Sequence, residues 1–170
     1  MGPGFRRGER IMSVYRATLD WKLAEGDDFA AGRYTRRHTL GFDGLEVPAS
    51  ASPLHVKAPY SADAAMDPEE AFVASISSCH MLWFLYLARE HGWVVERYRD
   101  HAEGLMAKNA DGKAAMTKVT LKPYIVFKGN QPSPREVDHL HHRAHDECYI
   151  ANSVKTEVAV EPQSAAADTE

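Results

Sequence analysis

Residues 67–92, DPEEAFVASISSCHMLWFLYLAREHG, hold the most apolar run of the chain between a helix start and a helix stop. Asp67 suits an N-cap, Pro68 suits the first helical position, and Glu70 completes a capping box. Gly92 supplies the stop. The spacing predicts a helix of about 22 residues and about 33 Å that is apolar nearly all round. Such a helix belongs at the centre of the fold.

This apolar run is interpreted as a buried helix of a soluble protein. Residues 71–88 have the length of a membrane span, but they include three serines, a cysteine and a histidine. Residues 1–12 contain no apolar stretch and are expected to form a flexible extension, not a secretory signal. The sequence therefore predicts a cytoplasmic protein without a membrane partner.

The sequence before this helix predicts an antiparallel meander. Residues 13–21 and 34–42 alternate between apolar and polar side chains, as half-buried strands do. The dipeptide Asp43-Gly44 predicts a hairpin that leads into a short strand at residues 45–47. Residues 48–63 contain three prolines and are expected to form a long loop.

The sequence after the helix predicts a second hairpin, a second helix and a last strand. Residues 93–106 and 115–127 look like two strands joined by a turn at residues 109–112. Ser133-Pro134-Arg135-Glu136 repeats the helix-start pattern, which predicts a helix to about Cys148. A final strand is expected at 154–160 and a flexible tail at 163–170. The prediction is an α+β domain over residues 13–162 with the order β-β-β-α-β-β-α-β.

Composition narrows the class of protein. The chain has 170 residues, 44% of them hydrophobic and 26% charged, which fits one globular domain. Its formal net charge of -4 gives no basic field for nucleic acid. Two cysteines are too few for the disulfide framework of a small secreted domain.

The two cysteines, Cys79 and Cys148, are expected to reach the same interior. Cys79 lies midway along the apolar helix, and Cys148 continues the apolar register of Val137, Leu140 and Ala144 on the second helix. One interpretation is a pair of inert core cysteines that act as small hydrophobes. The other is a redox pair, which requires one thiol to be ionised.

A thiolate at Cys79 needs a positive charge nearby to stabilise it. The helix dipole does not supply that charge, because Cys79 lies about three turns into the helix and the dipole acts mainly within the first turn. Arg36 lies on the more apolar face of the predicted strand at residues 34–42, so we expect it to be the thiolate partner. If the register slips by one residue, Arg37 or Arg33 takes that place. The alternative is an exposed arginine at a sheet edge.

Two motifs resemble the OsmC/Ohr family, which comprises osmotically inducible protein C and the organic hydroperoxide resistance proteins. The first motif runs from Asp67-Pro68-Glu69-Glu70 to Ser77-Ser78-Cys79-His80, and the second from His145-Asp146-Glu147-Cys148 to Asn152-Ser153. The resemblance extends from about Val14 to Pro162. The chain departs from the family in two places: Tyr149 stands where much of the family has proline, and residues 32–37 lack the paired glycines typical of the hydroperoxide-resistance branch. It therefore looks like a member of an OsmC-like branch of the family.

The resemblance implies a peroxiredoxin-like organic hydroperoxide reductase that acts in the oxidative stress response, without cofactor or metal. By position, Cys79 is the peroxidatic cysteine, Cys148 the resolving cysteine, Arg36 the arginine and Glu69 the carboxylate that holds it. The implied fold is an intertwined homodimer with antiparallel sheets around long central helices. An external dithiol, in one branch dihydrolipoamide on lipoylated proteins, is the implied reductant.

Helix geometry also favours a dimer. Glu69 and Cys79 are ten residues apart, or about 15 Å along a continuous helix, so one chain does not bring both to one site. If both residues serve one site, either a second chain supplies one of them or the helix is kinked. The apolar pocket for an organic substrate is expected among the following side chains, each of which is also a candidate for plain core: Phe72, Met81, Trp83, Phe84 and Tyr149.

Two functions of other classes remain open at this point. His141, His145 and Cys148 lie at i, i+4 and i+7 of the second helix, which suits a zinc-binding module, against a solvated histidine-rich face. A non-catalytic member of the fold that binds small hydrophobic molecules is the other alternative. His80 is expected to point away from Cys79.

Overall fold

The computed structural model describes residues 13–164, so the predicted N-terminal extension and residues 165–170 of the tail lie outside the described residues. The chain divides into two compact units, an N-terminal unit that ends at Ala71 and a C-terminal unit that begins at Phe72. Helices and sheets are mixed, which confirms the α+β class. The expectation of a single domain over residues 13–162 stays a prediction.

The N-terminal unit contains the predicted meander. Strands β1 (Thr18–Asp20), β2 (His38–Phe42) and β3 (Leu45–Ala49) form one antiparallel sheet in that order. Asp43 and Gly44, with φ of 38° and 91°, form the two-residue turn between β2 and β3, because a hairpin of this length needs left-handed backbone.

The first two strands are shorter than predicted. The predicted strands at residues 13–21 and 34–42 pair only over Thr18–Asp20 and His38–Phe42. The backbone before β2 is bonded elsewhere: the Thr35 N–H donates to the Asp27 carboxylate at 3.0 Å, and the Arg36 N–H donates to the Tyr60 carbonyl at 2.8 Å. Alternation of side chains in this segment therefore does not reflect strand pairing.

Helix α1 (Pro68–Glu90) confirms the central helix. The Glu70 N–H donates to Asp67 Oδ1 at 2.8 Å and the Asp67 N–H donates to Glu70 Oε2 at 3.2 Å, which is the predicted capping box. Gly92, with φ of 77°, ends the helix. By length and composition α1 could also cross a membrane, which is weak evidence because the core helix of a soluble protein passes the same test.

The second hairpin is confirmed, but its two long strands are each divided. Strands β4 (Val94–Asp100) and β7 (Pro123–Lys128) form one antiparallel pair, and β5 (Glu103–Lys108) and β6 (Ala114–Leu121) form another. The division falls at Asp100, whose carboxylate accepts hydrogen bonds from Ser77 Oγ at 2.5 Å and from the Lys122 N–H at 2.6 Å. Asp100 is the last residue of β4 and pairs with Pro123, and its carboxylate binds the main chain of Lys122 between β6 and β7.

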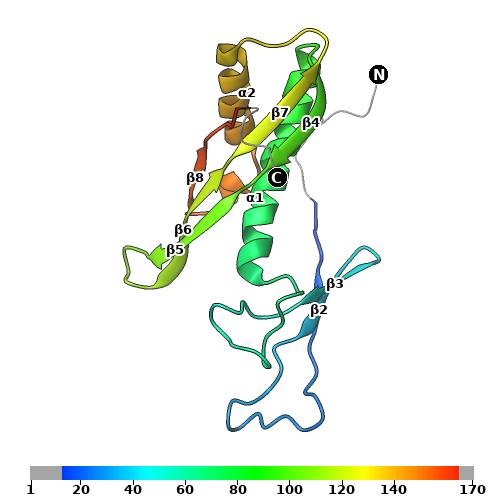
Figure 1. The fold of residues 1–170 in the computed structure, drawn as a ribbon, viewed down its shortest axis with the longest axis vertical. Helices are drawn as coiled ribbons and strands as arrows, with labels where there is room; N and C mark the ends of the chain where they lie inside the picture. Colours follow the sequence, from blue (N-terminus) through cyan, green and yellow to red (C-terminus); the bar gives the residue numbers. More distant parts are fainter. Residues whose placement is uncertain (1–12, 165–170) are drawn as a thin grey trace. The chain divides into compact units, whose positions relative to one another are not determined.

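Helix α2 (Pro134–Glu147) and strand β8 (Glu157–Val160) complete the C-terminal unit (Figure 1). Ser133 caps α2 as predicted, and β8 lies parallel to β6. The last strand begins three residues later than expected, and Gln163, in the predicted tail, still donates its N–H to the Pro123 carbonyl at 2.8 Å.

The core of this unit has two parts, and both lie on α1. The larger cluster joins the C-terminal half of α1 to α2 and includes Phe84, Leu87, Leu140 and Cys148. The smaller one joins Ile76 of α1 to buried residues of β6. Because α1 supplies side chains to both clusters, it fixes where Cys79 lies in the unit.

Candidate active site

Two free thiols meet in the C-terminal unit. Cys79, midway along α1, is half-buried, whereas Cys148, at the end of α2, is 1% exposed. Cys148 belongs to the larger core cluster, Cys79 packs against that cluster, and the two thiols interact electrostatically. The expectation that these sulfurs reach the same interior is confirmed. The roles assigned to them stay predictions.

The turn after α2 holds Cys148 in place. The Ala151 N–H donates to Cys148 Sγ at 3.4 Å, and the Asn152 side chain donates to the carbonyls of Asp146 and Cys148 at 2.8 and 3.0 Å. Burial raises the pKa of Cys148 to about 11. The neighbouring Cys79 thiol also raises this pKa, whereas the hydrogen bond from the Ala151 N–H lowers it. Cys148 is therefore a protonated thiol at neutral pH.

The five predicted pocket residues divide between core and surface. Phe84 is completely buried and packs against Tyr98 and His141, so it serves as core. Trp83 and Tyr149 pack edge to face, with centroids 5.5 Å apart, and Tyr149 is 46% exposed. Trp83 also belongs to the cluster that contains both cysteines.

The other two predicted pocket residues lie elsewhere along α1. Phe72 packs against the smaller cluster, next to Ile76, and Met81 is half-buried. Trp83 and Phe84 thus belong to the cluster that contains the cysteines, and Tyr149 packs against the ring of Trp83.

Arg36 belongs to the N-terminal unit and lies before β2, so the prediction that it sits on a strand is wrong. Its guanidinium stacks 3.7 Å from the Tyr34 ring centroid and donates to the carbonyls of Gly32 and Tyr34 at 3.1 and 2.6 Å. The ring of Tyr34 packs in turn against Phe29 and Trp21. Aromatic contacts, not strand register, determine where this arginine points.

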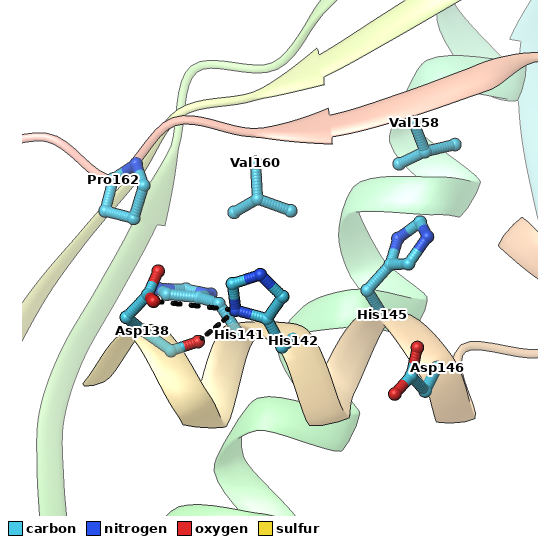
Figure 2. Close-up of a pocket in the computed structure, with 8 residues that line it drawn as sticks. All are labelled: Asp138, His141, His142, His145, Asp146, Val158, Val160 and Pro162. Carbon is cyan, nitrogen blue, oxygen red and sulfur yellow. Dashed lines mark hydrogen bonds and ion pairs between the residues drawn. The ribbon is translucent and has the colours of Figure 1, made fainter. Parts of the chain in front are cut away.

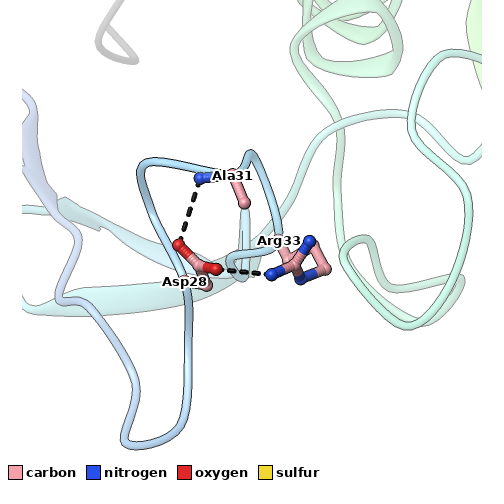
Figure 3. A network of polar contacts seen from close by, with 3 residues as sticks. All are labelled: Asp28, Ala31 and Arg33. Atoms are coloured by element: carbon pink, nitrogen blue, oxygen red, sulfur yellow. Dashed lines mark hydrogen bonds and ion pairs between the residues drawn. The ribbon is translucent and has the colours of Figure 1, made fainter.

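The two alternative arginines have different surroundings. Arg33 is paired with Asp28 at 2.5 Å, and the same carboxylate accepts from the Ala31 N–H at 3.1 Å (Figure 3). Arg37 is exposed and lines a shallow, open depression of the N-terminal unit. Arg33 already has a carboxylate partner, which leaves Arg36 and Arg37 as the better candidates for a thiolate.

Glu69 is the second residue of α1 and is half-buried. Among residues 13–164, the side-chain hydrogen bonds of Arg36 go to main-chain carbonyls, and none goes to Glu69. Helix α1 is uninterrupted from Pro68 to Glu90, so Glu69 and Cys79 lie about 15 Å apart along its axis. Pairing of Arg36 with Glu69 stays a prediction.

A buried histidine pair joins α1 to α2, and sequence reasoning missed it. His80 Nε2 and His141 Nδ1 are 3.0 Å apart, the rings are stacked, and both residues are at most 2% exposed. Burial lowers the pKa of His80 to about 4 and that of His141 to about 3, so both are neutral at pH 7. The position of His80 within an apolar helix was the available signal.

The alternative of a zinc site that includes Cys148 is not supported, because this thiol lies in the core cluster against which Cys79 packs. Within residues 13–164, no group of three or more histidine, cysteine or acidic side chains is arranged to hold a metal ion. The other interpretation was a solvated histidine-rich face, and it holds only in part, because His141 is buried and His145 is half-buried.

Comparison with known proteins gives consistent matches. The sequence model of the OsmC-like protein family matches residues 61–163. The structure of an OsmC-like protein of unknown function from Vibrio cholerae is 47% identical, with a TM-score of 0.88 over 89% of this chain and 100% of that chain. No curated protein sequence matches the chain.

More distant structures share the fold. An organic hydroperoxide resistance protein from Legionella pneumophila is 19% identical, with a TM-score of 0.60 over 88% of this chain and 96% of that chain. Another from Bacillus subtilis is 17% identical, with a TM-score of 0.62 over 89% of this chain and 100% of that chain.

Proposed function

The chain belongs to the OsmC-like protein family, and on that basis we propose that it is a thiol-dependent peroxidase that reduces organic hydroperoxides to alcohols. The observation that carries the proposal is the contact between two free thiols that differ in burial. Cys79 is the more accessible sulfur and the one that attacks peroxide. Cys148 is the buried, protonated neighbour that resolves the product.

The reaction balances with these two groups and an external dithiol. The Cys79 thiolate attacks the outer peroxide oxygen, the O–O bond breaks, and the alkoxide takes a proton and leaves as alcohol. The Cys79 sulfenic acid then condenses with the Cys148 thiol, which forms a disulfide and releases water. A dithiol of the lipoyl class, free or on a protein, returns two electrons and two protons.

The polar groups of this site come from two chains in the proposal. Arg36 stabilises the Cys79 thiolate and the charge that grows on the leaving oxygen, and Glu69 orients Arg36 through paired hydrogen bonds. The continuous α1 helix keeps Glu69 about 15 Å from Cys79 of its own chain, which supports an active site shared across a homodimer. Each site then takes both cysteines from one subunit and Arg36 with Glu69 from the other.

The substrate has an apolar tail in this proposal. Trp83 lies in the same cluster as both cysteines, and Tyr149, directly after Cys148, packs on its edge and stays half-exposed. Such rings favour organic hydroperoxides over hydrogen peroxide. The protein is proposed to act in the cytoplasm during oxidative stress.

The direct test is titration of the reduced protein with a small organic hydroperoxide while free thiols and intact mass are followed. We expect two thiols to be lost per equivalent of peroxide, with a mass decrease of two hydrogens. Cys79→Ser abolishes turnover, and Cys148→Ser traps an oxidised Cys79. Retention of both thiols under excess peroxide would contradict the enzyme and favour a non-catalytic binder of hydrophobic molecules.

A further inference from the structure

A small cavity of about 170 Å³ opens in the C-terminal unit between α2 and β8 (Figure 2). Three histidines of α2 line one side of it, and Val158 and Val160 of β8 line the other. Neither cysteine of the proposed peroxidase site lines this cavity. It therefore requires an explanation of its own.

Two imidazole nitrogens at this cavity are buried without a partner among the described residues. His141 is 2% exposed, and its Nδ1 is engaged by His80, so that its Nε2 is the free end of the ring. Nδ1 of His145 is also buried and unpartnered. Buried polar atoms in native proteins are nearly always paired, so such atoms at a cavity indicate a bound species.

The charges around the cavity favour a cation. Asp138 and Asp146 lie at its margin, and no lysine or arginine lines it. Imidazole nitrogen with carboxylate oxygen is a ligand set suited to zinc and other transition-metal dications.

The helical spacing adds a second argument. His141 and His145 are at i and i+4, the spacing at which two histidines on one helix face bind a single zinc ion in metalloproteases. A metal-bound histidine usually donates its other N–H to a fixed acceptor, and His80 Nε2 lies 3.0 Å from His141 Nδ1. The buried histidine pair thus orients the ring of His141 toward a ligand.

We propose that this cavity binds one divalent transition-metal ion, such as Zn²⁺, through His141 and His145. Since no three ligating side chains already converge within residues 13–164, the protein supplies two imidazoles and water fills the other positions. The exposed carboxylate of Asp138, one turn before His141, adds charge and can approach by rotation of its side chain. Neither thiol lines this cavity, and the site does not depend on the peroxidase proposal.

The test is calorimetric titration of the reduced, tag-free full chain with Zn²⁺. We expect one ion per chain, and affinity about tenfold weaker or worse in His145→Gln and in His141→Gln. His139→Gln is the matched control, because His139 is an exposed histidine of the same helix that does not line the cavity, and its affinity stays that of the wild type. His145 is only half-buried, so His145→Gln remains informative if His141→Gln does not fold.

Absorption with Co²⁺ in place of Zn²⁺ separates this site from the cysteines. The expected spectrum lacks the strong thiolate-to-metal band, because both ligands are imidazoles. No binding, unchanged affinity in His145→Gln, or a thiolate band would each overturn the proposal.

Discussion

The two units of the chain differ in what they bury. In the C-terminal unit, Phe84 and Ile76 are completely buried and two core clusters form around α1. Among the described residues of the N-terminal unit, the buried hydrophobic side chains are Ala49 and Ala62, whereas Leu54 is 92% exposed. Further large apolar side chains of this unit lie open to solvent, namely Val14, Tyr15, Leu19, Leu23, Phe29 and Leu45.

This difference indicates that the C-terminal unit holds its own core and the N-terminal unit does not. Exposed apolar surface of this extent is typical of an interaction site, because its burial is favourable by about 25 cal/mol per Å². In the homodimer proposed above, a second copy of the chain covers this surface and also supplies the Glu69 that lies about 15 Å from Cys79 along α1 within one chain. The first predictions below test whether the N-terminal unit depends on that copy, and the later ones test which features depend on contacts within the chain.

The largest effect is expected from mixed dimers. Arg36→Ala and Cys79→Ser each lose nearly all peroxide turnover alone, because one removes the cation and the other the nucleophile. If Arg36 and Cys79 of one site come from different chains, a heterodimer of the two variants has one intact site. Random exchange between subunits then restores about a quarter of wild-type activity. Peroxide consumption after co-refolding of equal amounts measures this.

The control mixes Cys79→Ser with Cys148→Ser. Both cysteines of a site lie in one chain, so no heterodimer regains an intact pair and activity stays absent. An inactive mixture of Arg36→Ala with Cys79→Ser would show that one chain holds the whole site. An active Arg36→Ala alone would remove Arg36 from the mechanism and direct attention to Arg37.

Core substitutions compare the stability of the two units. Phe84→Ala is expected to lower the free energy of unfolding by about 3–5 kcal/mol, as for other buried aromatic residues. Leu19 is 64% exposed in the single chain. If the proposed homodimer covers it, Leu19→Ala is expected to cost more than about 1 kcal/mol. Urea unfolding at two protein concentrations measures both, and wild-type stability rises with concentration. A neutral Leu19→Ala with concentration-independent unfolding would mean that this surface is uncovered.

Local signals made the two helices predictable. Capping boxes at Asp67 and Ser133 use residues within one turn, and the structure has both. The apolar register that placed Cys148 inward is equally local, since Leu140, Ala144 and Cys148 are all at most 1% exposed. Helix ends and helix faces are therefore recoverable from the sequence.

Features that depend on distant partners were not predictable. Arg36 was assigned to a strand by alternation, but its backbone bonds to Tyr60 and its side chain stacks on Tyr34. The His80–His141 pair joins residues 61 positions apart, so no local pattern shows that the two rings hydrogen-bond to each other inside the core. Division of the second hairpin at Asp100 depends on a carboxylate that bonds across 22 and 23 positions.

The pH dependence of Cys148 labelling tests whether burial and Cys79, both within the C-terminal unit, raise the pKa of this thiol. Its pKa is raised to about 11, so labelling of Cys148 by iodoacetamide is expected to remain slow until the pH approaches that value. In Cys79→Ser the pKa falls, because the hydrogen bond and charge of Cys79 are gone, while burial keeps it above the usual range. Mass spectrometry of labelled peptides across pH measures this. Fast labelling of Cys148 near pH 8 in the wild type would contradict a buried, protonated resolving thiol.

The smallest effect compares the caps of the two helices. Asp67 is 6% exposed and accepts from the Glu70 N–H at 2.8 Å, whereas Ser133 is exposed and its bond from the Glu136 N–H is 3.4 Å long. Asp67→Ala is therefore expected to cost about 1–2 kcal/mol of unfolding free energy, and Ser133→Ala about 0.5–1 kcal/mol. Asp67→Ser keeps an acceptor at the cap and is the conservative control. The first turn of α1 lies in the N-terminal unit. If Asp67→Ala lowers the free energy of unfolding no more than Ser133→Ala does, the core contacts of α1 hold this helix in place without its cap.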